Sequence, residues 1–134
     1  MSDYELMLAA ARARENAYAP YSNFRVGAAL LTSDGRVFTG CNIENAAYSP
    51  TNCAERTAFF KAVSEGVRDF AAIAIVGGKG ENPDAVCTPC GVCRQVMAEF
   101  CKPDFRVILG NAEQTAAYTL DSLLPYSFSL NGEG

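Results

Sequence analysis

Apolar residues recur along the first part of the chain at spacings that predict a helix followed by two strands. From Asp3 to Tyr18 the sequence is rich in Ala, Leu, Arg and Glu, with apolar positions at helical spacing, and Ala19-Pro20 ends this pattern. Phe24–Thr32 is compact and apolar, Ser33–Arg36 has turn chemistry, and Val37–Cys41 resumes an extended pattern. These segments predict a helix and then a β-hairpin.

The middle of the chain predicts a loop, a second helix and a buried strand. Asn42–Asn52 is polar and is interrupted by Pro50, which favours a loop. Cys53–Glu65 has a helical pattern, and Gly66 provides a helix end. Ala71–Val76 is a continuous apolar run bounded by glycines, as expected for a strand buried on both faces.

The last part of the chain predicts one more helix and one more strand. After a loop that carries Cys87, Pro89 lies in the expected first turn of a helix that runs to about Phe100. Phe105–Leu109 predicts a strand, whereas Thr119–Gly134 gives no clear pattern. This order indicates a mixed sheet with helices on its faces, an α/β or α+β fold. Because nothing in the 134 residues marks a linker, residues 1–134 are expected to form a single domain.

Charge and hydropathy restrict the partners of this domain. The net charge is −4, and the Lys and Arg residues are scattered singly, without the clustered cations that polynucleotide binding requires. A small, nearly neutral substrate is therefore favoured over nucleic acid. No apolar run approaches the roughly 20 residues that span a bilayer, and the acidic N-terminus does not resemble a secretory signal. The sequence predicts no membrane partner and a cytoplasmic location.

The six cysteines favour metal binding or buried thiols over disulfides, because the chain lacks a secretory signal and has enough apolar residues for a core. There is no histidine, so a zinc site would depend on thiolates and a general acid or base on a carboxylate. Cys53, Cys90 and Cys93 supply three thiolates, and Glu55 supplies the carboxylate. Three protein ligands leave the fourth tetrahedral position of zinc to water, which is typical of a catalytic site.

The predicted helices place these residues at two helix starts. Residues two apart point roughly 200° away from each other in mid-helix, so Cys53 and Glu55 can serve one ion only if it lies beyond the N-terminal end. Cys90 and Cys93 are three apart and share a helix face. Both helix dipoles would then stabilise thiolate. Arg56 could donate hydrogen bonds to a ligand sulfur and offset the charge of three thiolates.

Simpler interpretations exist for several of these residues. Cys87 could act as a fourth ligand and close a structural zinc site. Arg56 could be an ordinary surface salt-bridge partner. Cys41 and Cys101 are expected to be buried free thiols.

The two zinc motifs and three further segments resemble one enzyme family. Cys53–Glu55 (CAE) and Pro89–Cys93 (PCGVC) are similar to the paired motifs of zinc deaminases. Tyr18–Leu30 (YAPYSNFRVGAAL), Asn42–Ala46 (NIENA) and Cys90–Gln95 (CGVCRQ) resemble the small cytidine deaminases, and the resemblance covers nearly the whole chain.

This resemblance implies a three-layer α/β/α fold with a mixed central sheet of about five strands flanked by helices. It implies one zinc ion per chain, held by Cys53, Cys90 and Cys93, and hydrolysis of free cytidine and deoxycytidine to uridine and deoxyuridine with release of ammonia, a step of pyrimidine salvage. In the family reaction, a water activated by zinc attacks C4 of cytosine while Glu55 moves protons to N3 and to the leaving ammonia.

The resemblance also assigns residues that bind the nucleoside. Asn42 and Glu44 would hold the ribose hydroxyls, Phe24 would line the sugar and base pocket, and the backbone of Ala54 would read the pyrimidine. Phe128 resembles an aromatic residue that reaches the base bound by a neighbouring subunit. Members of this short type are usually homotetramers, so pockets at subunit interfaces are expected.

Two alternatives stay open at this stage. The same chemistry could act on an aminated antibiotic or on nucleic acid, although the acidic charge disfavours nucleic acid. A non-catalytic module with a four-sulfur structural zinc is the alternative from another functional class.

Overall fold

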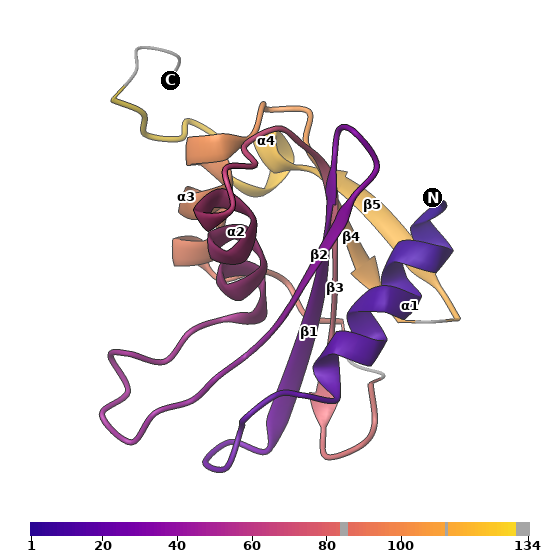
Figure 1. Cartoon of the computed structure of the whole chain (residues 1–134), viewed down its shortest axis with the longest axis vertical. Helices are drawn as coiled ribbons and strands as arrows, with labels where there is room; N and C mark the ends of the chain where they lie inside the picture. The colour runs from indigo at the N-terminus through magenta and orange to yellow at the C-terminus, as the bar shows by residue number, and fades with distance from the viewer. Residues whose placement is uncertain (84–85, 112, 131–134) are drawn as a thin grey trace.

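The computed structural model describes residues 1–83, 86–111 and 113–130. A five-stranded sheet separates α1 on one face from α2 and α3 on the other (Figure 1). The strands are β1 (Phe24–Thr32), β2 (Val37–Cys41), β3 (Phe70–Lys79), β4 (Arg106–Gly110) and β5 (Thr115–Thr119), and the helices are α1 (Asp3–Arg14), α2 (Ala54–Ser64), α3 (Gly91–Phe100) and α4 (Leu120–Leu123). None of the helices in the described residues combines the length and apolarity that crossing a bilayer requires.

The sheet is mixed, as the order of elements predicted. Its strand order is β2-β1-β3-β4-β5. β3 and β4 pair in parallel, and every other neighbouring pair is antiparallel. The three-layer arrangement and the five strands confirm the expected fold class. The helix α3 lies in the connection between the two parallel strands, which brings the start of α3 to the same sheet face as α2.

Two apolar clusters fill the space on either side of the sheet. Alternate residues of β3 pack into the two clusters. Ile73 and Ile75 belong to the cluster on the side of α2 and α3, and Ala72 and Ala74 belong to the cluster on the side of α1. All four side chains are at most 2% exposed. Because β3 is buried on both faces, its sequence is a continuous apolar run rather than an alternating one.

Arg14 fastens the end of α1 to the strands beneath it. This arginine is 4% exposed, its Nε donates to the carbonyl of Arg25 at 3.0 Å, and its Nη2 donates to the carbonyls of Gly78 at 2.9 Å and Gly80 at 2.7 Å. A guanidinium can satisfy several carbonyls at once, so the buried charge is compensated by charge-assisted hydrogen bonds. The last turn of α1 is thereby fixed against the ends of β1 and β3.

The structure corrects two sequence predictions and defines part of the C-terminal segment that had no clear pattern. The helix α1 ends at Arg14 and not at Tyr18, because the Tyr18 backbone pairs instead with the loop after β2, donating to the Asn42 carbonyl and accepting from the Glu44 amide. Pro89 precedes the N-cap of α3 rather than lying in its first turn. The segment without a clear pattern, Thr119–Gly134, begins with the last residue of β5 and contains α4. Residues 131–134, the end of the predicted domain, lie outside the described residues.

A glycine in β2 allows α2 to lie directly on the sheet. A Cβ atom at Gly40 would come within 2.4 Å of the Ala54 carbonyl oxygen and 2.6 Å of the Ala58 amide nitrogen. Both are backbone atoms of α2, so a side chain could be accommodated only if the helix moved. The first turn of α2 therefore depends on glycine at this position.

Replacement of Gly40 by Ala is expected to lower the free energy of unfolding by about 1–3 kcal/mol, the usual cost of overpacking a close contact. Urea denaturation measures this change. Gly91→Ala is the matched control, because a Cβ at Gly91 would meet nothing within 4 Å. Equal stability of Gly40→Ala and the wild type would contradict the proposed close contact.

Candidate metal centre

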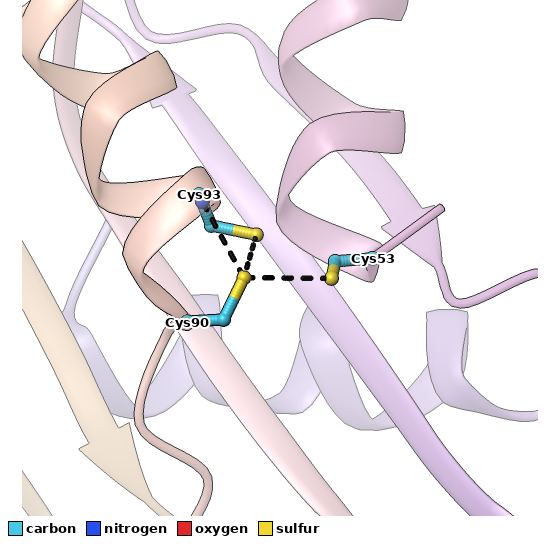
Figure 2. A group of neighbouring side chains, drawn as sticks. All are labelled: Cys53, Cys90 and Cys93. Atoms are coloured by element: carbon cyan, nitrogen blue, oxygen red, sulfur yellow. Dashed lines mark hydrogen bonds between the residues drawn. The ribbon is translucent and has the colours of Figure 1, made fainter. Parts of the chain in front are cut away.

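Three thiols from two helices converge on one point. The sulfurs of Cys53, Cys90 and Cys93 all lie within 4.8 Å of one another and point toward each other (Figure 2). The Cys90 sulfur is 3.8 Å from that of Cys53 and 3.3 Å from that of Cys93. The structure thus brings together the three cysteines that the sequence motifs singled out.

The cysteines occupy the starts of α2 and α3, as expected from the sequence. Cys53 is the N-cap of α2, Cys90 is the N-cap of α3, and Cys93 lies in the first turn of α3. The Cys93 amide donates to the Cys90 sulfur at 3.4 Å, so the sulfur caps the helix as an oxygen would. Two helix N-termini with partial positive charge therefore face the same group of sulfurs, which favours thiolates.

Arg56 lies beside the thiols, and its partner there is a sulfur rather than a surface carboxylate. Its Nη2 donates to the Cys53 sulfur at 3.2 Å, and its half-buried side chain keeps Nε buried without a hydrogen-bond partner among the described residues. This hydrogen bond to the Cys53 thiolate raises the pKa of Arg56. The hydrogen bond that we expected between Arg56 and a candidate ligand sulfur is present.

The thiols influence one another's ionisation. A hydrogen bond from Cys93 lowers the pKa of Cys53 to about 5, and a hydrogen bond from Arg56 adds to this effect. The same interaction with Cys53 raises the pKa of Cys93, and burial raises it further. The contacts therefore favour the thiolate form at Cys53 over that at Cys93.

Glu55 is a buried carboxylate in the first turn of α2. It is 4% exposed, and burial raises its pKa to about 7, with the negative charge of Cys53 contributing in the same direction. Carboxylates are rarely buried, because transfer of the charged group out of water costs several kcal/mol unless partners compensate it. Its position two residues after Cys53 places it at the helix end that carries the thiols.

The donor set fits an open zinc site. Zinc prefers thiolate and imidazole, and three Cys thiolates are a known part of tetrahedral zinc coordination. The described residues add no fourth Cys, Asp or Glu ligand atom to the group. Cys87, the candidate fourth ligand, lies outside it and packs instead near Gly77 and Phe24, where burial raises its pKa to about 12. The four-sulfur structural site is therefore not supported.

The two remaining cysteines are free thiols, as predicted, but they are half-buried rather than buried. Burial raises the pKa of both Cys41 and Cys101. Neither belongs to the group of converging sulfurs.

The two candidate ribose-binding residues lie near β1 and make internal hydrogen bonds. The Asn42 side chain accepts from the Val26 amide at 2.9 Å and donates to the Phe24 carbonyl at 2.9 Å. The Glu44 carboxylate accepts from the Tyr21 amide at 3.0 Å and from both the amide and the hydroxyl of Ser22. These contacts lower the pKa of Glu44, the Ser22 hydroxyl contributing most, and they fix both side chains on the loops that flank β1.

The other candidate nucleoside-binding residues differ in exposure. Phe24 is half-buried against the core cluster on the α2 side, and Ala54 is fully buried at the first position of α2. Phe128 is 66% exposed in the C-terminal segment, where its carbonyl accepts a hydrogen bond from Gln95 of α3 at 3.1 Å. Ala54 therefore directly follows the Cys53 thiol at the start of α2, whereas the Phe128 side chain is exposed.

Two residues that position the site were missed by sequence reasoning. Ser22 holds Glu44, and Arg94 donates to the Pro89 carbonyl directly before Cys90 at 2.8 Å. A serine two residues after Pro20 is a common turn residue, and an arginine directly after Cys93 is the one local indication that was available.

Comparison with known proteins agrees with this geometry. Residues 1–109 match the family model described as the cytidine and deoxycytidylate deaminase zinc-binding region. A cytidine deaminase of Sporosarcina psychrophila is 54% identical over 132 residues, covering 95% of this chain and 92% of that protein. A cytidine deaminase of Halalkalibacterium halodurans is also 54% identical, over 92% of each chain.

A solved structure gives the same result in three dimensions. The crystal structure of a cytidine deaminase from Burkholderia pseudomallei is 52% identical, and it aligns with a TM-score of 0.87 over 96% of this chain and all of that chain. Sequence motifs, thiol geometry and fold all agree with the family match. The chain therefore belongs to the cytidine and deoxycytidylate deaminase zinc-binding family.

Proposed function

We propose that this chain is a zinc-dependent cytidine deaminase that converts free cytidine and deoxycytidine, with one water, to uridine or deoxyuridine and ammonia. The observation that carries this proposal is the open set of three converging thiols with the buried Glu55 at the same helix end. The similarity to cytidine deaminases over most of the chain supports it. A net charge of −4 also favours a free nucleoside over a nucleic acid.

In this proposal Cys53, Cys90 and Cys93 hold zinc, and Glu55 moves the protons. Zinc bound there supplies the Lewis acidity that lowers the pKa of a water molecule. Glu55 would accept a proton from the attacking water and deliver it to N3 of the cytosine as the water oxygen adds to C4. Glu55 would then take the remaining water proton from the new C4 hydroxyl and pass it to the amine, so that the bond between C4 and the amine nitrogen breaks, ammonia leaves and the C4 carbonyl of uridine forms.

Arg56 has a supporting role in the same reaction. Three thiolates exceed the charge of a divalent zinc by one, and this excess negative charge weakens Lewis acidity. The guanidinium within 3.2 Å of the Cys53 sulfur withdraws part of that charge. The α2 and α3 N-termini contribute in the same direction.

The nucleoside is proposed to lie between the β1 loops and the start of α2. Asn42 and Glu44 hold the ribose hydroxyls, the Phe24 ring lines the sugar and base pocket, and the Ala54 backbone reads the pyrimidine edge. Since Asn42 and Glu44 already bond to β1 and its preceding loop, they are oriented before the ligand arrives.

We further propose that four copies assemble and that Phe128 of one copy reaches the base bound by a neighbour. The exposure of this aromatic ring and of Tyr126 in the same segment supports a role outside its own chain. The whole of residues 1–134 is proposed to form one catalytic domain. A role in pyrimidine salvage in the cytoplasm fits a site that depends on reduced thiols.

Incubation of the purified protein with cytidine is expected to yield uridine and ammonia in equal amounts, because each hydrolysis consumes one water and releases one ammonia. Chromatography of the nucleosides and an ammonia assay measure both products. Deoxycytidine, a single-stranded oligonucleotide and an antibiotic that carries cytosine are tested in parallel. Turnover of the oligonucleotide or the antibiotic without turnover of cytidine would refute the proposed substrate.

Replacement of Glu55 by Gln is expected to reduce turnover by a factor of about 10² or more, because the amide cannot accept a proton. Zinc content measured by mass spectrometry is expected to stay at the wild-type level, since Glu55 is not proposed as a ligand. Glu65→Gln, at the exposed other end of α2, is the matched control and is expected to keep full activity. Wild-type turnover by Glu55→Gln would eliminate its proton-transfer role.

Replacement of Arg56 by Gln is expected to lower turnover about 10-fold or more while most zinc stays bound, because a neutral amide compensates less thiolate charge. Metal content and kcat are measured on the same preparation. If Arg56 is only a surface residue, the variant will match the wild type in both measurements.

A further inference from the structure

Arg94 connects the second thiol motif to the C-terminal segment. It directly follows Cys93 in α3, and its half-buried side chain makes two hydrogen bonds to carbonyls far apart in the sequence. Its Nε donates to the Pro89 carbonyl at 2.8 Å, and its Nη1 donates to the Leu123 carbonyl at 2.6 Å. Because a guanidinium is rigid and planar, these two bonds fix the two carbonyls relative to each other.

The first of these carbonyls determines where Cys90 lies. It belongs to the peptide that joins Pro89 to Cys90, and Cys90 is the N-cap of α3. A carbonyl before the N-cap has no partner in the helical hydrogen-bond pattern, so a side chain must supply the donor when it is shielded from water. Pro89 is fully buried, and Arg94 is that donor. Holding this peptide holds the direction of the Cys90 side chain.

The second carbonyl belongs to the segment that carries Phe128. Leu123 is the last residue of α4, and the next residue after Arg94, Gln95, donates to the Phe128 carbonyl at 3.1 Å. Two consecutive residues of α3 therefore hold the C-terminal segment at two points. Movement of α4 would pull on the same guanidinium that orients the Cys90 peptide.

We propose that Arg94 is a positioning residue that couples the C-terminal segment to the zinc centre. The proposal rests on the proposed role of Cys90 as a zinc ligand. Coupling between two sites is reciprocal, so loss of the Arg94 contacts weakens zinc retention and loss of zinc loosens α4. The segment that bears Phe128 is thereby held more firmly when the metal centre is intact.

Replacement of Arg94 by Lys tests the first direction, because a single ammonium keeps the charge but cannot bridge both carbonyls. We expect a chelator to remove zinc about 10-fold faster or more from this variant, as for other partners of metal ligands. The rate is followed by the absorbance of the zinc–chelator complex. Arg106→Lys is the matched control, since Arg106 pairs with Asp3 at 2.7 Å on an exposed part of β4. A wild-type release rate in Arg94→Lys would overturn the proposal.

Hydrogen exchange of the wild-type protein tests the reverse direction without any variant. The amides of Leu120, Asp121 and Leu124 are hydrogen-bonded, so their exchange reports the docking of α4. Removal of zinc is expected to accelerate exchange in α4 more than in α1, which lies on the other face of the sheet. Unchanged exchange in α4, or equal acceleration in α1, would overturn the coupling. If the untreated protein contains one zinc per chain and α4 does not respond, only the coupling fails and the proposed function stands.

Discussion

The meeting of two helix starts at one point is the constraint on which the site depends. The core between α2 and α3 sets this meeting, because Phe59 of α2 contacts the rings of Phe70, Phe100 and Phe105 at centroid distances between 5.1 and 6.3 Å. Phe59 is fully buried, so the two helices cannot slide without breaking close-packed contacts. The positions of the sulfurs at the helix starts thus follow from aromatic packing farther along the same helices.

The electrostatics of the site follow from the lack of histidine. With thiolates as the available soft ligands, the centre accumulates negative charge, and the surrounding backbone must offset it. Two helix N-termini and the Arg56 guanidinium supply positive charge within the first turns of α2 and α3. Glu55 sits in this environment without exposure to water, which gives a single carboxylate an unusual affinity for protons. A motif of a few residues therefore contains both the charge and its compensation.

Much of this fold could be predicted because its strong patterns are local. The apolar run of β3 and the turn before β2 identify their strands directly, and the helical pattern that opens at Cys53 identifies the start of α2. The strand β5 could not be predicted, since Thr115–Thr119 is an edge strand with mostly exposed side chains and two alanines, so it lacks the apolar alternation. Tyr18 was misplaced because its long-range pairing overrides helical propensity.

The residues of the site also divide into those that local patterns could predict and those that they could not. Arg56 and the Cys90–Cys93 pair were predictable because each contact joins residues three apart, whereas the approach of Cys53 to this pair was inferred from the shared motif chemistry. The bonds of Glu44 to Ser22 and of Arg94 to Leu123 span 22 and 29 residues, and no local pattern reports such contacts. Cys53 and Cys90 are themselves 37 residues apart, with α2 and β3 between them. A metal ion bound to both sulfurs therefore acts as a cross-link. In the entropic model used for disulfides, closing a loop of this length raises the free energy of the denatured chain by about 4 kcal/mol. The same atoms that prepare the chemistry would make resistance to denaturation depend on the supply of metal.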